Sequence, residues 1–102
     1  MPTGFFDAAW KKMSQIPRGR VTTYGEIARA LKKPGAGRAV GNACKANPNA
    51  PQVPCHRVVA SNGSLGGYAG GLRKKIGLLK KEGVLTENGK ITEFKHVFWR
   101  FK

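Results

Sequence analysis

Acidic residues are scarce in this sequence, and their scarcity narrows the class of partner. Five Asp and Glu stand against nineteen Lys and Arg in 102 residues, which gives a formal net charge of +14. Such an excess destabilises a compact chain through self-repulsion, and a bound polyanion relieves it. We therefore expect nucleic acid as the partner, with an anionic membrane surface as the alternative.

Long apolar runs are missing as well. No apolar stretch approaches the roughly 20 residues that a bilayer-spanning helix needs, and the N-terminus lacks the continuous apolar core of a signal peptide. We therefore expect a soluble intracellular protein without membrane attachment, either cytoplasmic with the nucleoid or nuclear. The 102 residues suffice for one compact domain with one modest core.

Cysteine and histidine are too few and too irregularly spaced for a familiar metal site. Cys44 and Cys55 lie eleven positions apart, and His56 and His96 are the only histidines. This spacing fits no common zinc pattern, so we expect neither a metal nor a cofactor. A disulfide between the two cysteines is the alternative, and a reducing compartment disfavours it.

Helical patterns dominate and predict a mainly α fold with small β elements, in a single domain similar to a winged helix-turn-helix. Apolar residues at helical spacing begin after Thr3 and end before Pro17. Thr23 and Glu26 form a capping box ahead of a second helix, which Pro34 ends. The predicted divisions of 1–102 are a helix-turn-helix at about 23–46, an active-site loop at 47–59, a small hairpin or wing with a pocket loop at 60–71, a last helix at 72–83 and a basic, aromatic tail at 84–102.

The last helix and the tail carry further signals. Leu72, Ile76 and Leu79 are predicted to form the buried stripe of the helix. The Asn-Gly pair at 88–89 predicts a hairpin turn. Aromatic and basic residues are mixed at 94–102, a pattern that can stack on single-stranded bases. We favour the simpler interpretation that this segment covers an exposed core.

The second helix of the predicted helix-turn-helix is unusually slim. Ala and Gly fill six of the eleven positions at 36–46, while Arg38, Asn42 and Lys45 share one face. Each Gly in a helix interior costs roughly 0.5 to 1 kcal/mol relative to Ala, so the glycines suggest a compensating role. Close approach to a DNA groove is one such role, and packing against a neighbouring helix is an equal alternative.

Residues 54–58 read Pro-Cys-His-Arg-Val and place a soft nucleophile, Cys55, before a proton acceptor, His56. Adjacent side chains diverge, so either the backbone bends there or a water relays the proton from thiol to imidazole. Glu82 falls near the apolar arc of the last helix, and its carboxylate would orient His56. Taken singly, each residue has an ordinary structural interpretation, as a core cysteine, a satisfied histidine and a helix-end glutamate paired with lysine.

Five sequence motifs stand in a fixed order along the chain. They are IPRGRVTTYGEIA at 16–28, GRAVG at 37–41, ANP at 46–48, PCHRVV at 54–59 and GYAGG at 67–71. In this order they resemble the C-terminal domain of the O6-alkylguanine-DNA alkyltransferase family. The likeness spans about residues 3 to 83, and the ordered set is far more specific than one Cys-His pair.

The resemblance implies DNA repair by direct reversal. Such proteins bind double-stranded DNA in the minor groove, flip O6-alkylguanine out of the stack and move its alkyl group onto a cysteine. Because a thioether is a poor leaving group, the protein would be a methylated-DNA–cysteine methyltransferase that acts once. We expect a monomer that needs no cofactor.

Catalytic roles follow from the resemblance. Cys55 would be the alkyl acceptor, His56 its base through a water, and Glu82 the group that orients His56. Tyr24 would help rotate the nucleotide and donate a proton or hydrogen bond to the guanine. Asn47 would act as a hinge that braces the turn before the active-site loop.

The resemblance also implies roles in DNA and substrate binding. Arg38 would fill the space left by the flipped base. The other predicted DNA-binding residues are Thr23, Gly37, Ala39, Gly41, Asn42 and Lys45. The predicted pocket for the alkyl group and guanine comprises Val58, Tyr68, Ala69 and Gly70. Small residues in the groove read sequence poorly, so affinity should come from phosphate contacts and DNA deformability.

The chain departs from the family pattern in length and at one pocket position. Most members carry an additional N-terminal domain, which a separate partner could supply here. A short chain is typical of the alkyltransferase-like proteins, which bind alkylated guanine without transfer and usually have Trp or Ala in place of the cysteine. Because Cys55 is kept, we expect transfer. Ala69 replaces a serine of some members, which removes a hydroxyl contact to the guanine oxygen.

Two other functions are compatible with the same sequence. One is a non-enzymatic lesion-binding protein that recruits another repair pathway, and the other is a helix-turn-helix regulator that reads one DNA sequence. Lesion binding without transfer would identify the first. Indifference to the lesion would identify the second.

Overall fold

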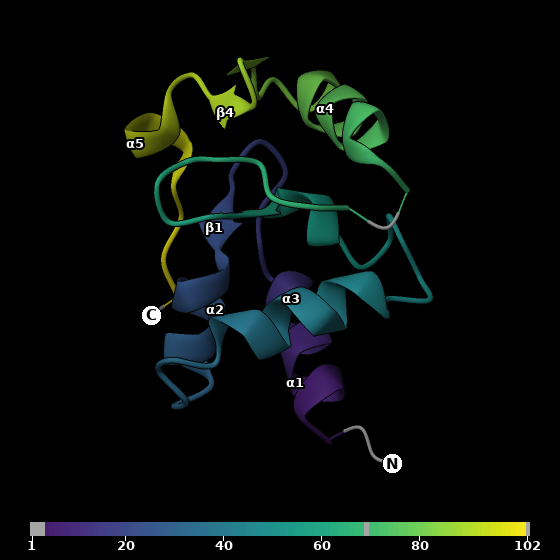
Figure 1. Ribbon diagram of the computed structural model, residues 1–102, viewed down its shortest axis with the longest axis vertical. Coiled ribbons are helices and arrows are strands. Elements are labelled where there is room, and N and C mark those ends of the chain that lie inside the picture. The colour runs from purple at the N-terminus through teal and green to yellow at the C-terminus, as the bar shows by residue number, and fades with distance from the viewer. Residues whose placement is uncertain (1–3, 69, 102) are drawn as a thin grey trace.

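Helices and short strands alternate along the chain. The computed structural model describes residues 4–68 and 70–101 (Figure 1). In chain order the elements are α1 (Gly4–Met13), β1 (Thr22–Thr23), α2 (Tyr24–Ala30), α3 (Gly37–Lys45), the 3-10 turn η1 (Cys55–Arg57), β2 (Val58–Val59), α4 (Leu72–Lys81), β3 (Thr86–Glu87), β4 (Lys90–Ile91) and α5 (Phe94–Val97). The prediction of a mainly α fold with small β elements is confirmed. None of the helices in the described ranges is long and apolar enough to cross a membrane.

A short parallel strand pair links the two ends of the molecule. Helices α1, α2 and α3 gather at one end, while α4, β4 and α5 lie at the other (Figure 1). β1 pairs in parallel with β2, with Thr22 opposite Val58 and Thr23 opposite Val59. Because β1 leads directly into α2 and β2 directly follows η1, this pairing fixes the start of the helix-turn-helix beside the turn that contains Cys55.

Two buried clusters form the core. The first consists of Ala9, Met13, Ile16, Ile27, Ala28, Val40, Ala43, Cys44, Cys55, Val58 and Phe101. The second consists of Val21, Val59, Leu65, Leu79, Val84 and Ile91. The consecutive residues Val58 and Val59 belong to different clusters because successive strand side chains point to opposite faces. β2 therefore joins the two clusters.

The start of α2 contains only one half of the predicted capping box. Thr23 is the N-cap, and its Oγ1 accepts a hydrogen bond from the backbone N–H of Glu26 at 3.0 Å. The Glu26 carboxylate instead accepts two hydrogen bonds from Arg29, at 2.9 and 2.6 Å, and one from the Phe101 backbone N–H at 2.8 Å. A contact to the distant tail thus replaces the expected return contact to the N-cap.

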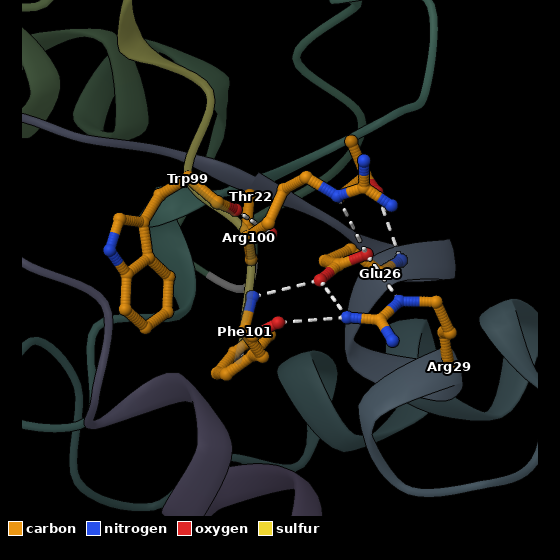
Figure 2. Close-up of polar contacts among 7 residues, drawn as sticks. Thr22, Glu26, Arg29, Trp99, Arg100 and Phe101 are labelled. Atoms are coloured by element: carbon orange, nitrogen blue, oxygen red, sulfur yellow. Dashed lines mark hydrogen bonds and ion pairs between the residues drawn. The ribbon is translucent and has the colours of Figure 1, made fainter.

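The tail returns to the helix-turn-helix and closes the first cluster (Figure 2). The Trp99 backbone N–H donates to the Val21 carbonyl at 2.7 Å, and Thr22 Oγ1 donates to the Trp99 carbonyl at 2.8 Å. Arg29 Nη2 donates to the Phe101 carbonyl at 3.0 Å. Phe101 is only 6% exposed, which confirms the interpretation that this segment covers a core.

Of the two predicted hairpins, one is present among the described residues. β3 and β4 pair antiparallel around Asn88 and Gly89, whose φ angles of 54° and 79° suit a tight hairpin turn. Near 60–71 the sequence predicts a small hairpin or wing. The chain does form a local turn, in which the Ala60 N–H donates to the Ser64 carbonyl at 2.8 Å, but β2 pairs with β1, and Ser64 pairs with Lys90 of the β3–β4 hairpin. The Leu65 backbone N–H donates to the Gly89 carbonyl at 3.0 Å. Glycine-rich strands specify their register weakly, so this segment pairs with a strand that is distant in the sequence.

The buried face of α4 differs from the predicted stripe. Leu79 is fully buried as expected, but Leu72 is 46% exposed, so its predicted burial is wrong. Leu72 is the first residue of the helix, directly after Gly71 at φ 98°, and lies at the edge of the packed region. The buried position one turn before Leu79 belongs to Lys75, which is 0% exposed. The helix ends at Lys81, so Glu82 is its C-cap residue.

Candidate active site

Cys55 is the first residue of the 3-10 turn η1 and is almost completely buried. Asn47 Nδ2 donates hydrogen bonds to Cys55 Sγ at 3.4 Å and to the Val53 carbonyl at 2.8 Å. The Asn47 backbone N–H also binds the Cys44 carbonyl at 3.3 Å. Asn47 therefore ties the end of α3 to the turn that carries the thiol, the position that a hinge residue needs.

His56, Arg57 and Glu82 form one hydrogen-bonded group next to this thiol in the chain. Glu82 Oε2 lies 3.1 Å from His56 Nε2 and accepts a hydrogen bond from Arg57 Nη2 at 2.7 Å. Arg57 also donates to Glu82 Oε1 at 2.9 Å and to the Ile16 carbonyl at 2.8 Å. His56 Nδ1 is buried and has no hydrogen-bond partner among the described residues. With Nε2 held by the carboxylate, Nδ1 is the nitrogen available to take a proton.

Burial and hydrogen bonding set the protonation of this group. Burial lowers the pKa of His56 below its usual value, although Glu82 opposes the change, so the imidazole is neutral near pH 7. Burial alone would raise the pKa of Glu82, but the hydrogen bonds from Arg57 and His56 outweigh it and hold that pKa below its usual range. A neutral imidazole oriented by an ionised carboxylate is the form that accepts a proton.

The pKa of the Cys55 thiol lies below its usual value. The largest cause is the neighbouring thiol of Cys44, which can donate a hydrogen bond to a Cys55 thiolate. Burial opposes this effect, whereas the Asn47 amide and the Lys75 ammonium add to the lowering. The same contact, together with burial, raises the pKa of Cys44. A lowered pKa favours the Cys55 thiolate, and the thiolate is the nucleophilic form of cysteine.

Sequence patterns did not predict a role for Lys75. Its fully buried ammonium donates hydrogen bonds to the carbonyls of Val58 at 2.8 Å, Gly67 at 3.2 Å and Leu65. Burial lowers the pKa of Lys75 to about 8, although the two nearby thiols oppose the change. Lys75 thus joins β2 to the glycine-rich loop. Its spacing of four residues from buried Leu79 was the one signal that could have revealed it.

A cavity of about 390 Å³ opens between α3 and the glycine-rich loop, the segment that contains Gly66, Gly67 and Tyr68. Its walls are formed by Tyr24, Gly37, Arg38, Gly41, Asn42, Cys44, Lys45, Gly66, Gly67 and Tyr68. Burial raises the pKa of Tyr24 to about 12, so its phenol stays protonated and can donate a hydrogen bond into the cavity. Among the described residues, no group of three or more His, Cys, Asp and Glu is placed to hold a metal ion.

The cavity brings together most of the predicted binding residues. Arg38, Asn42 and Lys45 lie exposed along one face of α3, and all three line the cavity. The neighbouring Gly37, Gly41 and Tyr68 line it too, whereas half-buried Ala39 and exposed Gly70 do not. Ala69 lies outside the described residues.

Two predicted binding residues lie elsewhere. Thr23 is 5% exposed, and its hydroxyl accepts the N-cap hydrogen bond of α2, so its side chain is buried and its role in DNA binding stays a prediction. Val58 is 0% exposed and packs in the first cluster, so its side chain does not line the pocket. Both residues belong to the β1–β2 pair, and their side chains are buried.

Sequence comparison places this chain among proteins of one named family. The family described as "6-O-methylguanine DNA methyltransferase, DNA binding domain" matches residues 4–84. A methylated-DNA–protein-cysteine methyltransferase of Salmonella typhimurium is 51% identical over 73 residues, which are 72% of this chain and 43% of that protein. The protein of the same name from Methanosarcina mazei is 53% identical over 70 residues, 69% of this chain and 44% of that protein. The chain therefore spans less than half the length of both relatives.

Solved structures show the same likeness. A Mycobacterium tuberculosis OGT in complex with DNA matches with a TM-score of 0.78 and 48% identity, over 80% of this chain and 51% of that one. Schizosaccharomyces pombe Atl1, in complex with damaged DNA containing O6-carboxymethylguanine, matches with a TM-score of 0.85 and 31% identity, over 99% of both chains. The second match includes the tail. With a family match over 81 of its 102 residues, counted from 4 to 84, this chain belongs to the 6-O-methylguanine DNA methyltransferase family, in the part that forms its DNA-binding domain.

Proposed function

We propose that this domain binds DNA that carries O6-alkylguanine and moves the alkyl group irreversibly onto Cys55. One observation carries the proposal: Cys55 directly precedes His56, whose Nε2 lies 3.1 Å from the Glu82 carboxylate and whose buried Nδ1 has no hydrogen-bond partner among the described residues. The relatives named for this reaction, about half identical over the matched region, support it.

The proposed chemistry is a single displacement at the alkyl carbon. His56 takes the proton of Cys55 through a water, and the thiolate attacks the carbon attached to guanine O6. A sulfur–carbon bond forms as the carbon–O6 bond breaks, and the electron pair leaves with the guanine. Tyr24 donates a hydrogen bond to the purine as its negative charge develops. The product is a stable thioether, so each molecule acts once.

The proposed DNA-binding surface is the exposed face of α3. Arg38 would enter the space vacated by the flipped base, and Asn42 and Lys45 would contact the backbone. Gly41 keeps the helix slim. A Cβ added at Gly41 would have no protein atom within 4 Å, so in the proposed complex it would project toward the DNA. The net charge of +14 would attract the DNA phosphates, so the affinity for DNA should fall steeply as the salt concentration rises.

The direct test is transfer of a methyl group from O6-methylguanine in a duplex. We expect the tryptic peptide 46–57, which contains Cys55, to gain the mass of one CH₂ per protein molecule while the lesion becomes guanine. The matched control is Cys55→Ala, which should bind the duplex and leave the lesion unchanged. A wild-type protein that binds the lesion tightly without modifying it would overturn transfer and identify a lesion sensor. Equal affinity for undamaged DNA would argue against both.

Gly66 offers a second test, because it determines where Tyr24 lies. A Cβ at Gly66 would come within 2.6 Å of the Tyr24 hydroxyl, and its φ of +71° is strained for other residues. Gly66→Ala should displace Tyr24 and slow methyl transfer by about tenfold or more, since one positioned hydrogen-bond donor is lost. Gly77→Ala, on α4, is the control, because a Cβ added there meets no protein atom within 4 Å and Gly77 does not line the cavity. Equal rates for the two variants would contradict this role of Tyr24, as measured by single-turnover kinetics.

A further inference from the structure

Arg57 is a charged residue beside the reacting pair, and the proposed reaction gives it no step. It is the last residue of η1, directly after His56, and its side chain is 15% exposed. Its Nε and Nη2 donate to the two oxygens of the Glu82 carboxylate at 2.9 and 2.7 Å, and its Nη1 donates to the Ile16 carbonyl at 2.8 Å. Holding a long side chain at three points costs rotamer freedom, which an arginine that only charged the surface would keep.

The two hydrogen bonds to Glu82 fix the carboxylate as well as the arginine. A guanidinium that donates to both oxygens sets the position of the carboxylate and the plane in which it lies. Glu82 Oε2, one of the two oxygens in this fork, lies 3.1 Å from His56 Nε2. Arg57 therefore determines where the oxygen that faces the imidazole lies.

The segment between α1 and β1 holds the same glutamate from another side. Arg18 Nη2 in this segment donates to the Lys81 carbonyl at 3.0 Å, at the end of α4. A Cβ at Gly19 would come within 3.3 Å of the Glu82 carbonyl, so a glycine lets the segment approach closely. The third hydrogen bond of Arg57 reaches this segment too. Arg57 thus ties η1, the segment after α1 and the end of α4 together around one carboxylate.

The two partners of the Glu82 carboxylate differ in how they carry charge. An arginine side chain stays positively charged across the physiological pH range, so Arg57 balances the carboxylate without any proton on His56. A neutral imidazole can then face the carboxylate as a donor through Nε2, and this tautomer leaves Nδ1 unprotonated. His56 Nδ1 is buried and has no hydrogen-bond partner among the described residues.

We propose that Arg57 is a positioning residue, which holds the Glu82 carboxylate in a fork and balances its charge, so that His56 keeps a free acceptor nitrogen for the proton of Cys55. The inference deepens the proposed function and rests on His56 as the base. Without Arg57, the buried carboxylate would favour a protonated His56, and an imidazolium cannot take a second proton.

The other groups that face His56 do not supply this contact. Lys75 is the other positive charge near the imidazole, but its ammonium donates to three backbone carbonyls. The Tyr68 ring stands at 87° to the imidazole with 6.5 Å between centroids, and burial raises the pKa of its phenol, so it carries no charge. Burial lowers the pKa of His56, Glu82 opposes the change, and the charges of Arg57 and Lys75 add to the lowering.

The test compares Arg57→Met, which removes both the fork and the charge, with Arg57→Lys, which restores the charge. NMR follows the protonation of the His56 imidazole as a function of pH, with the exposed His96 as internal reference. We expect the midpoint of His56 to move upward in Arg57→Met and to return most of the way to the wild-type value in Arg57→Lys. Methyl transfer near pH 7 should slow about tenfold in Arg57→Met and recover in part as the pH rises and His56 loses its proton.

A second pair of variants separates charge balance from mere loosening of the site. Arg57 is also replaced by methionine in the Glu82→Gln background, where no buried charge is left unpaired and folding is less at risk. A loosened site would raise the midpoint of His56 in both backgrounds, whereas loss of charge balance raises it only where Glu82 is present.

Three results would overturn the inference. They are an unchanged midpoint in Arg57→Met, an equal rise with and without Glu82, and an Arg57→Lys protein that titrates like Arg57→Met. A rise that depends on Glu82 and is reversed by lysine would support it. Since the titration of His56 needs no DNA, failure of the proposed function would appear separately, as absence of methyl transfer in the wild type.

Discussion

Replacing Glu82 by glutamine is expected to slow methyl transfer to Cys55 by about 10²-fold, because the base loses the carboxylate that orients it and stabilises its protonated form. Glu82 Oε2 lies 3.1 Å from His56 Nε2 and also accepts from Arg57 at 2.7 Å. A glutamine in the same position can accept a hydrogen bond through its oxygen, but it cannot balance the charge of Arg57 or the charge that His56 gains when it takes the proton. Single-turnover kinetics with an O6-methylguanine duplex measure the loss.

The same substitution should lower the stability of the domain in a pH-dependent way. The hydrogen bonds from Arg57 and His56 hold the pKa of Glu82 below its usual value of 4.5. The contribution of this carboxylate is therefore fully present above about pH 4.5 and is lost as the pH falls through the folded-state pKa. We expect Glu82→Gln to cost about 3 kcal/mol at neutral pH, as loss of a buried ion-pair partner does. The difference from wild type should shrink on acidification.

Glu87 offers a matched control for Glu82. It is an exposed glutamate on β3, and Glu87→Gln should change stability by less than about 0.5 kcal/mol and leave transfer unaffected. Urea unfolding at several pH values measures stability, and far-UV circular dichroism checks that each variant is folded in the kinetic assay. A Glu82→Gln protein that transfers methyl at the wild-type rate would refute the orienting role, whatever its stability.

Local signals in the sequence predicted local structure well. Thr23 caps α2 as its position before an apolar stripe indicates, and the Asn-Gly pair at 88–89 forms the tight turn of the β3–β4 hairpin. In both cases the determining contacts lie within a few residues. The partner of Glu26 could not be predicted in this way, because it is Phe101, 75 residues further along the chain.

Pairing between distant segments explains why β2 has a partner that the sequence did not indicate. β2 consists of two valines, which suit any half-buried strand, and the glycines that follow do not fix a register. Val58 therefore pairs with Thr22 in parallel rather than with its own neighbours. The burial of Thr23 and Val58, both predicted as binding residues, follows from the same pairing, because β1 and β2 pack their side chains inside the domain.

The site residues that belong to a sequence motif could be predicted. Those that reach the site only through folding of distant segments could not. Cys55 and His56 are adjacent in the chain, and Glu82 attracted notice because an acid near the apolar arc of a basic helix breaks the local pattern. Cys44 shows no such signal, and the signal for Lys75 is only its spacing of four residues from Leu79. A cysteine in a helix of small residues resembles core, and a lysine among lysines resembles a solvated face, until other segments place carbonyls and a thiol beside them.

Removing the ammonium of Lys75 should be the most destabilising single change that leaves the core volume nearly unchanged. In Lys75→Met the carbonyls of Val58, Leu65 and Gly67 lose their buried donor. Each unsatisfied buried acceptor costs about 1–3 kcal/mol, and relief of the buried charge offsets part of the sum. We expect a net loss of about 3 kcal/mol, which for a domain of this size lowers Tm by roughly 15 °C. Differential scanning calorimetry measures the shift.

The arrangement of the three carbonyls also distinguishes charge from geometry. An ammonium carries three donors at one point, whereas the planar guanidinium of Lys75→Arg spreads its donors over a larger fork that three convergent carbonyls cannot match. Lys75→Arg should therefore be destabilised nearly as much as Lys75→Met. Lys80→Met, at an exposed position of the same helix, should shift Tm by only a few degrees. If Lys75→Met were as stable as Lys80→Met, the link from β2 to the glycine-rich loop would not depend on this side chain.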